Sequence, residues 1–120
     1  WLQASPEDVL SYYYRGTLLT QLKQYNEALA DFEKVLMLNP RFSQVFLHRG
    51  MIYYSIQEFD KALKEFSTLI ELFPRDAVAY YQRGLTYQAK GNCSKATQDF
   101  QQACRLSVLG QGCREECHRE

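Results

Sequence analysis

Apolar residues recur at helical intervals in two successive stretches of the chain. Residues 8–22 and residues 26–39 each carry one apolar stripe, which is the pattern of an amphipathic helix. Pro40 follows the second stretch and ends it, because proline cannot continue a helix and disfavours helical geometry just before itself. The pattern therefore predicts a helical hairpin. The stripes consist of Val9, Tyr12, Gly16, Leu19 and Leu22, and of Ala28, Leu29, Phe32, Val35, Leu36 and Leu38.

This hairpin pattern repeats every 34 residues. An Arg-Gly pair recurs at Arg15-Gly16, Arg49-Gly50 and Arg83-Gly84. A fixed period of this length predicts a repeat architecture of three stacked hairpins. The same offset relates Ala28, Ala62 and Ala96; Phe32, Phe66 and Phe100; Leu38, Leu72 and Leu106; and Pro40 and Pro74.

Capping residues indicate where the helices begin. Asn26, Asp60 and Ser94 are 34 residues apart, and each has a side chain that can accept a hydrogen bond from a free helical N–H group. We therefore expect them to be the N-caps of the second helices. At the front of the chain, Ser5 and Pro6 are typical of an N-cap and a first helical position.

The glycines at the centres of the first helices require a packing reason, because a mid-helix glycine costs about 1 kcal/mol relative to alanine. We expect them to allow close approach of the second helices through Ala28, Ala62 and Ala96, with the phenylalanines filling the space beyond. On this interpretation, Phe66→Ala would cost about 3 to 5 kcal/mol.

The sequence resembles the tetratricopeptide repeat (TPR) family. The family's large aromatic stands at Tyr12, Phe46 and Tyr80, and is followed by glycine, by a tyrosine at Tyr53 and Tyr87, and by alanine, phenylalanine and proline. Departures are Leu19, Cys93 and Val108. The resemblance implies an all-α, right-handed superhelical array of three hairpins. The predicted units are a lead-in at 1–8, repeats at 9–42, 43–76 and 77–110, and a polar, cysteine-containing tail or partial capping helix at 111–120.

By the same resemblance, the first helices line a concave groove that binds a protein or peptide. Its predicted surface is aromatic and aliphatic, which suits a protein contact. An alternative for Tyr13, Tyr54 and Tyr81 is packing against adjacent first helices. The groove residues are Tyr13, Thr17, Thr20, Leu47, His48, Met51, Tyr54, Val78, Tyr81, Gln82 and Leu85.

One subset of the family clamps the C-terminal carboxylate of Hsp70 or Hsp90 with lysine, asparagine and arginine. The matching positions here contain no lysine or arginine, so we predict that this chain is not of that type. A second class of function is a structural segment of a longer repeat protein, whose groove or ends pack on the parent chain or self-associate. The matching positions hold Tyr13, Thr17, His48, Val78 and Gln82.

The arginines of the Arg-Gly pairs are matched one for one by acids that precede the phenylalanines. We expect a ladder of ion pairs to acids on neighbouring second helices, which fixes the register of the repeats rather than binding phosphate. The acids are Asp31, Glu65 and Asp99.

Charge and composition name no other partner. The 120 residues contain 14 basic and 14 acidic side chains, which gives no basic patch for nucleic acid or for a membrane surface. No apolar stretch approaches the length of a membrane span, and no secretory signal is present. Because the chain begins at Trp1, we expect it to be cut from a longer protein, with a cytoplasmic location. No catalytic motif or cofactor site is found, so we predict that it is not an enzyme.

All four cysteines lie in the last 28 residues. Three interpretations remain open for them. Cys104, Cys113, Cys117 and His118 could hold a metal; two cysteines could form a disulfide; or Cys93 and Cys104 are small buried hydrophobes while Cys113 and Cys117 are free thiols. We favour the last and predict no metal.

The repeat pattern is lost after Leu106. An array of this kind usually ends in a capping helix, and none is evident here. We therefore expect the last hairpin to expose Ala103, Leu106 and Val108, and we consider self-association through this end.

Overall fold

The computed structural model describes residues 6–107. This part of the chain forms six α-helices and contains no strand. The six helices make three consecutive hairpins, so the all-α repeat architecture predicted from the 34-residue period is confirmed. The helices are α1 (Pro6–Gln21), α2 (Tyr25–Leu38), α3 (Ser43–Ser55), α4 (Phe59–Leu72), α5 (Ala77–Ala89) and α6 (Cys93–Leu106).

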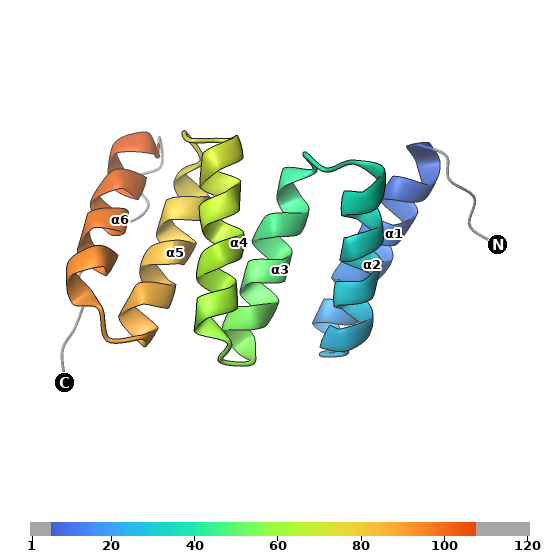
Figure 1. Ribbon diagram of the computed structural model, residues 1–120, viewed down its shortest axis with the longest axis horizontal. Helices are drawn as coiled ribbons and strands as arrows, with labels where there is room; N and C mark the ends of the chain where they lie inside the picture. The colour runs from blue at the N-terminus through green and yellow to red at the C-terminus, as the bar shows by residue number, and fades with distance from the viewer. Residues whose placement is uncertain (1–5, 108–120) are drawn as a thin grey trace.

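The hairpins follow one another along an elongated molecule of 49 × 27 × 20 Å (Figure 1). Each first helix packs on the second helix of its own hairpin, and α2 and α4 also pack on the first helix of the next hairpin. The first helices contact one another, α1 with α3 and α3 with α5, whereas no second helix described here contacts another. Second helices therefore lie on the outer side of the array, and α1, α3 and α5 form its inner face.

Three phenylalanines one period apart occupy the centre of the hairpins. Phe32, Phe66 and Phe100 are completely buried, as are the alanines that precede them by four residues. A methyl group added to Gly16 would lie 2.7 Å from Cε1 of Phe32, and one added to Gly84 would lie 2.7 Å from Cε1 of Phe100. The glycines were expected to face the alanines. Instead, their main neighbours are the phenylalanine rings, which lie directly over the glycine backbone.

The turns inside the hairpins correct the predicted caps. The second helices begin at Tyr25, Phe59 and Cys93, one residue before Asn26, Asp60 and Ser94. Those three residues are therefore already helical and cap nothing, because the turn is shorter than the sequence suggested. Only the third of these helices has a side-chain cap, in which Asn92 accepts a hydrogen bond from the N–H of Lys95.

A left-handed residue takes over the role of the cap in each turn. Lys23, Gln57 and Gly91 have φ angles of 63°, 65° and 86° and are exactly one period apart in the chain. The next residue in each turn donates its N–H to a carbonyl five residues earlier, as Gln24 does to Leu19 at 2.9 Å. This is the hydrogen bond of a Schellman motif, which ends a helix by satisfying its last carbonyls.

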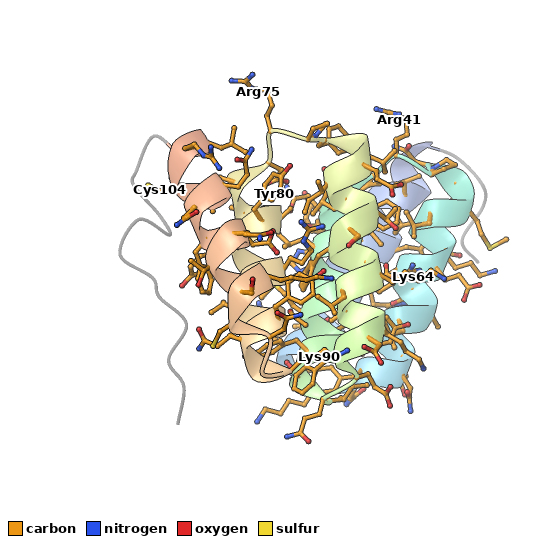
Figure 2. The ribbon with its side chains drawn as sticks, turned by 60° about the vertical axis from the view of Figure 1, so that its left-hand side comes forward. Arg41, Lys64, Arg75, Tyr80, Lys90 and Cys104 are labelled. Carbon is orange, nitrogen blue, oxygen red and sulfur yellow. The ribbon has the colours of Figure 1, made fainter. Side chains whose placement is uncertain are left out.

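Contacts at both ends of the helices join neighbouring repeats. Arg41 and Arg75 project from the same end of the array, and Lys90 lies at the other end (Figure 2). The guanidinium of Arg41 lies 5.5 Å from the centre of the Phe73 ring in the next repeat. At the opposite end, Lys90 of the third repeat pairs with Asp60 of the second.

The ends of the predicted stripes differ from expectation. Leu22 and Leu38 are exposed, because each lies at the end of its helix and beyond the reach of the partner helix. Ala103, expected to be exposed, is completely buried, because it faces the interior of the last hairpin in the same way as Leu69 of the second hairpin. Leu106 is half-buried, and Val108 lies outside the described residues.

We expect Gly16→Ala to destabilise the protein although alanine is the better helix former. The helical preference contributes about 1 kcal/mol in favour of alanine. Overpacking against the buried Phe32 ring costs about 1 to 3 kcal/mol, so a net loss of about 1 kcal/mol is expected in urea unfolding. In a Phe32→Leu background, which removes the ring, the same substitution should be neutral or stabilising. An equal loss in both backgrounds would contradict the proposed contact.

Candidate binding surface on the first helices

The eleven residues predicted to line the groove all lie on α1, α3 and α5, and none is fully buried. Met51 and Tyr54 of α3 are the most open of them, with 41% and 38% of their surface exposed. The other nine are partly buried. Met51 and Tyr54 are three residues apart, so they lie on the same side of the central first helix.

A hydrogen bond joins the first two first helices on this face. The hydroxyl of Tyr13 lies 3.0 Å from Nε2 of His48. The Tyr13 ring also packs at 5.0 Å from the Phe42 ring, and the imidazole of His48 stacks on Phe32 at 5.7 Å. Burial raises the pKa of Tyr13 and lowers the pKa of His48, because both lose water that would stabilise their charged forms. Both groups are therefore neutral near pH 7.

The remaining polar and aromatic groups of the face are held mainly by their own hairpins. The Tyr54 ring contacts Phe59 edge-on at 5.5 Å, and the Tyr81 ring lies 5.8 Å from Phe100. Thr17 and Thr20 donate their hydroxyl hydrogens to backbone carbonyls one turn earlier in α1. Of the three tyrosines considered for packing between first helices, only Tyr13 has such a contact described, with His48 of α3.

The arginines of the Arg-Gly pairs do bond the matching acids, but within each hairpin. Arg15 bonds Asp31 through Nε and Nη2, both at 2.7 Å, and Arg83 bonds Asp99 in the same two-pronged way at 2.9 and 2.8 Å. Arg49 bonds Glu65 at 2.8 Å. The expected ladder between repeats is therefore wrong, because each acid reaches the first helix on which its own helix packs.

These ion pairs are more than surface pairs, because the acids are almost completely buried. The hydrogen bonds to Asp99 are the main reason that the pKa of Arg83 is raised above its usual value. Removing one partner of a buried pair leaves an uncompensated charge, which costs about 3 to 5 kcal/mol. Since all three arginines are already bonded to carboxylates, they hold the hairpins together and are not a phosphate site.

The favoured interpretation of the cysteines is wrong for the two that are described. Cys93 and Cys104 are half-buried, and both are disulfide-bonded. They stand 11 residues apart in α6, about 16 Å along the axis, so they cannot be bonded to each other. Their partners therefore lie outside the described residues.

The alternative metal site loses Cys104 for the same reason, because a sulfur in a disulfide is not a thiolate ligand. Within residues 6–107, no group of three histidine, cysteine or acidic side chains could hold a metal ion. Cys113, Cys117 and His118 lie outside the described residues.

The chain belongs to the tetratricopeptide repeat family. Family models described as "Tetratricopeptide repeat" match residues 9–42 and 77–107, and one described as "TPR repeat" matches residues 50–91. Fold and family are those of a protein-interaction scaffold. No curated protein matches the chain. In the described part, no helix has the length and apolar character needed to cross a bilayer.

Solved structures of TPR proteins have the same fold. PcrH from Pseudomonas aeruginosa is 19% identical with a TM-score of 0.82, over 87% of this chain and 79% of that chain. The first TPR of Spaghetti (RPAP3), solved bound to the HSP90 peptide SRMEEVD, is 19% identical with a TM-score of 0.80, over 86% and 82% of the two chains. YrrB, described as having an unusual peptide-binding site, is 30% identical with a TM-score of 0.74; 80% of this chain matches half of that chain.

We expect the stability of the protein to fall at acidic pH through His48. Its pKa is lowered by burial in the folded state, so the unfolded chain takes up the proton first. This part of the free energy of unfolding is complete above about pH 6.5 and is lost as the pH falls through the lower, folded-state pKa. Urea unfolding between pH 4 and 8 would measure the loss.

The matched control is His48→Gln, because Gln82 stands at the same place in the third repeat. The variant should show a smaller loss of stability below pH 6.5. Identical pH profiles for the two proteins would contradict a role for His48.

Proposed function

We propose that this chain binds a peptide or a helix of a partner protein on the inner face formed by α1, α3 and α5. The observation that supports this most directly is the pair of exposed apolar side chains, Met51 and Tyr54, on the central helix of that face. Methionine adapts its shape to a partner, and tyrosine adds a large contact area with a polar end. The Tyr13–His48 contact borders the pair with a neutral, polar group.

The chemistry of this face favours an apolar or aromatic anchor on the partner. Neutral side chains stand at all of the positions that a carboxylate clamp would use, including Tyr13, His48 and Gln82. The arginines nearest in sequence are bonded to buried acids. A partner would therefore gain most of its affinity from apolar burial and from hydrogen bonds to the tyrosines.

A single substitution on α3 tests the surface. Met51→Glu adds a charge to the proposed face, and Met37→Glu makes the same change at an exposed methionine of α2, on the outer side of the array. Peptides selected on the wild-type protein from a displayed library should bind Met51→Glu at least about tenfold more weakly, because about 1.4 kcal/mol or more of apolar burial is lost. Binding to Met37→Glu should stay within twofold.

Two results would contradict the proposal. One is an equal loss of affinity in both variants. The other is a selection that yields no peptide, which would favour the structural alternative of a groove filled by a parent chain. Circular dichroism and melting temperatures of the three proteins show whether any loss of binding reflects unfolding.

We expect no binding of the peptide SRMEEVD, which was solved in complex with the first TPR of Spaghetti (RPAP3). Its acidic end finds no cation at Tyr13, Thr17, His48, Val78 or Gln82. Isothermal titration should give no saturable heat at micromolar protein. Micromolar binding that is lost when the peptide is amidated would place this chain in the carboxylate-clamp group.

A further inference from the structure

A stripe of exposed apolar side chains runs along α1 on a side that no described helix covers. Its members are four residues apart, so they lie on one side of the helix. Tyr14 and Leu18 form the middle of the stripe and have 63% and 55% of their surface exposed. Leu10 and Leu22 extend it in both directions and are also exposed.

The internal repeat shows what covers this side elsewhere in the molecule. The counterparts of Leu18 are Ile52 in α3 and Thr86 in α5, and both are completely buried. Ile52 belongs to a core cluster with Phe32 and Val35 of the preceding α2. The counterpart of Tyr14 is His48, whose ring stacks on the same Phe32. In the second and third repeats, this side of the first helix is thus covered by the second helix of the repeat before it.

An independent observation comes from the arginine next to Tyr14. The side chain of Arg15 is 56% exposed, whereas those of Arg49 and Arg83 are 20% and 22% exposed. All three bond the acid of their own hairpin, so the difference comes from the missing neighbour. Arg83 also donates from Nη1 to the hydroxyl of Ser67 on the preceding α4, at 3.3 Å.

We propose that this side of α1 docks an amphipathic helix in the position that α2 takes on α3 and that α4 takes on α5. The array then continues beyond α1, on a surface separate from the inner face proposed for peptide binding. An aromatic residue of that helix packs between Tyr14 and Leu18, as Phe32 packs on His48 and Ile52.

The covering helices specify further residues of the partner. The residue after the aromatic is Glu33 in α2 and Ser67 in α4, and each can accept a hydrogen bond from an arginine. Three residues further on, Leu36 and Ile70 pack on a cluster that contains Phe46 and Ala79. The partner helix therefore carries an aromatic residue, then a hydroxyl or carboxylate that faces Arg15, and an aliphatic residue one turn later.

A second copy of this chain cannot supply such a helix from its other end. In α6, the residue after Phe100 is Gln101, and the aliphatic position is taken by Cys104. Because the sulfur of Cys104 is in a disulfide, α6 cannot present the face that α2 and α4 present. The two ends of the array therefore differ, and only the α1 end has the surface of an inter-repeat contact.

A chain with an added repeat tests the proposal. Residues 43–76 are placed directly before Val9 in place of residues 1–8, so that Asp76 precedes Val9 as it precedes its counterpart Ala77 in the protein. This keeps the 34-residue register and the N-cap that Asp76 gives to the following helix. The extended chain should unfold in one transition, at a higher temperature than the 120-residue chain.

Leu18→Lys then distinguishes docking from simple addition. In the extended chain, the lysine falls in a buried contact and should lower the melting temperature by about 5 °C or more. In the 120-residue chain, where Leu18 is exposed, it should change the melting temperature by less than about 1 °C. Met37→Lys, at an exposed position of α2, should have the same small effect in both chains.

Three outcomes would overturn the proposal. The first is two separate unfolding transitions in the extended chain. The second is an equal effect of Leu18→Lys in the two chains. The third is a dimer of the 120-residue chain, seen by sedimentation, that Leu18→Lys dissociates, because a second copy of α1 would then occupy the face.

Discussion

The fold depends on one contact, which is repeated three times: a phenylalanine of the second helix lies against the backbone of a glycine in the first. The contact sets how closely the two helices of a hairpin approach. With the ring in place, the alanine one turn before it is also buried, and the acid beside it reaches the arginine beside the glycine. A phenylalanine side chain makes apolar contacts over its whole surface when buried, so the hairpin gains both stability and a unique register from this one residue.

The ion pairs and the apolar contacts divide the structure between them. The arginine–carboxylate pairs lie within hairpins, where the acids are buried, and the contacts between hairpins are mainly apolar. Exceptions are few and lie at the ends of the helices or at Ser67. Each hairpin is thus electrostatically complete, and its neighbours supply the apolar cover that it lacks. This explains why α1, which has no preceding helix in the described part, shows both an apolar stripe and a more exposed arginine.

Much of the fold could be predicted from the sequence because its signal is periodic. The helices, the start of α1 at Pro6 and the pairing of arginines with acids all follow from residues that recur every 34 positions. The errors lie where the answer depends on backbone geometry or on distant residues. The left-handed conformation of Lys23 and Gln57 shortens the turns, and neither residue type announces it. The disulfides of Cys93 and Cys104 depend on partners outside α6, which spacing alone does not identify.

The candidate site was predictable as a face and not as a set of contacts. Helical periodicity places Met51 and Tyr54 on α3, but their exposure depends on how far apart the neighbouring first helices lie. The hydrogen bond between Tyr13 and His48 likewise requires the distance between α1 and α3, which no local pattern contains. Whether these residues bind a partner remains a proposal.

The three hairpins differ in how strongly their local sequence directs the chain. The third turn has a glycine at the left-handed position and a side-chain cap from Asn92, and α5 is capped by Asp76. The first two turns hold a lysine and a glutamine in a conformation that costs L-residues about 1 to 2 kcal/mol. In a linear array, folding starts in the repeat that forms most readily and spreads to its neighbours. The last hairpin is accordingly the place where folding of this chain begins, and structure then grows back toward α1.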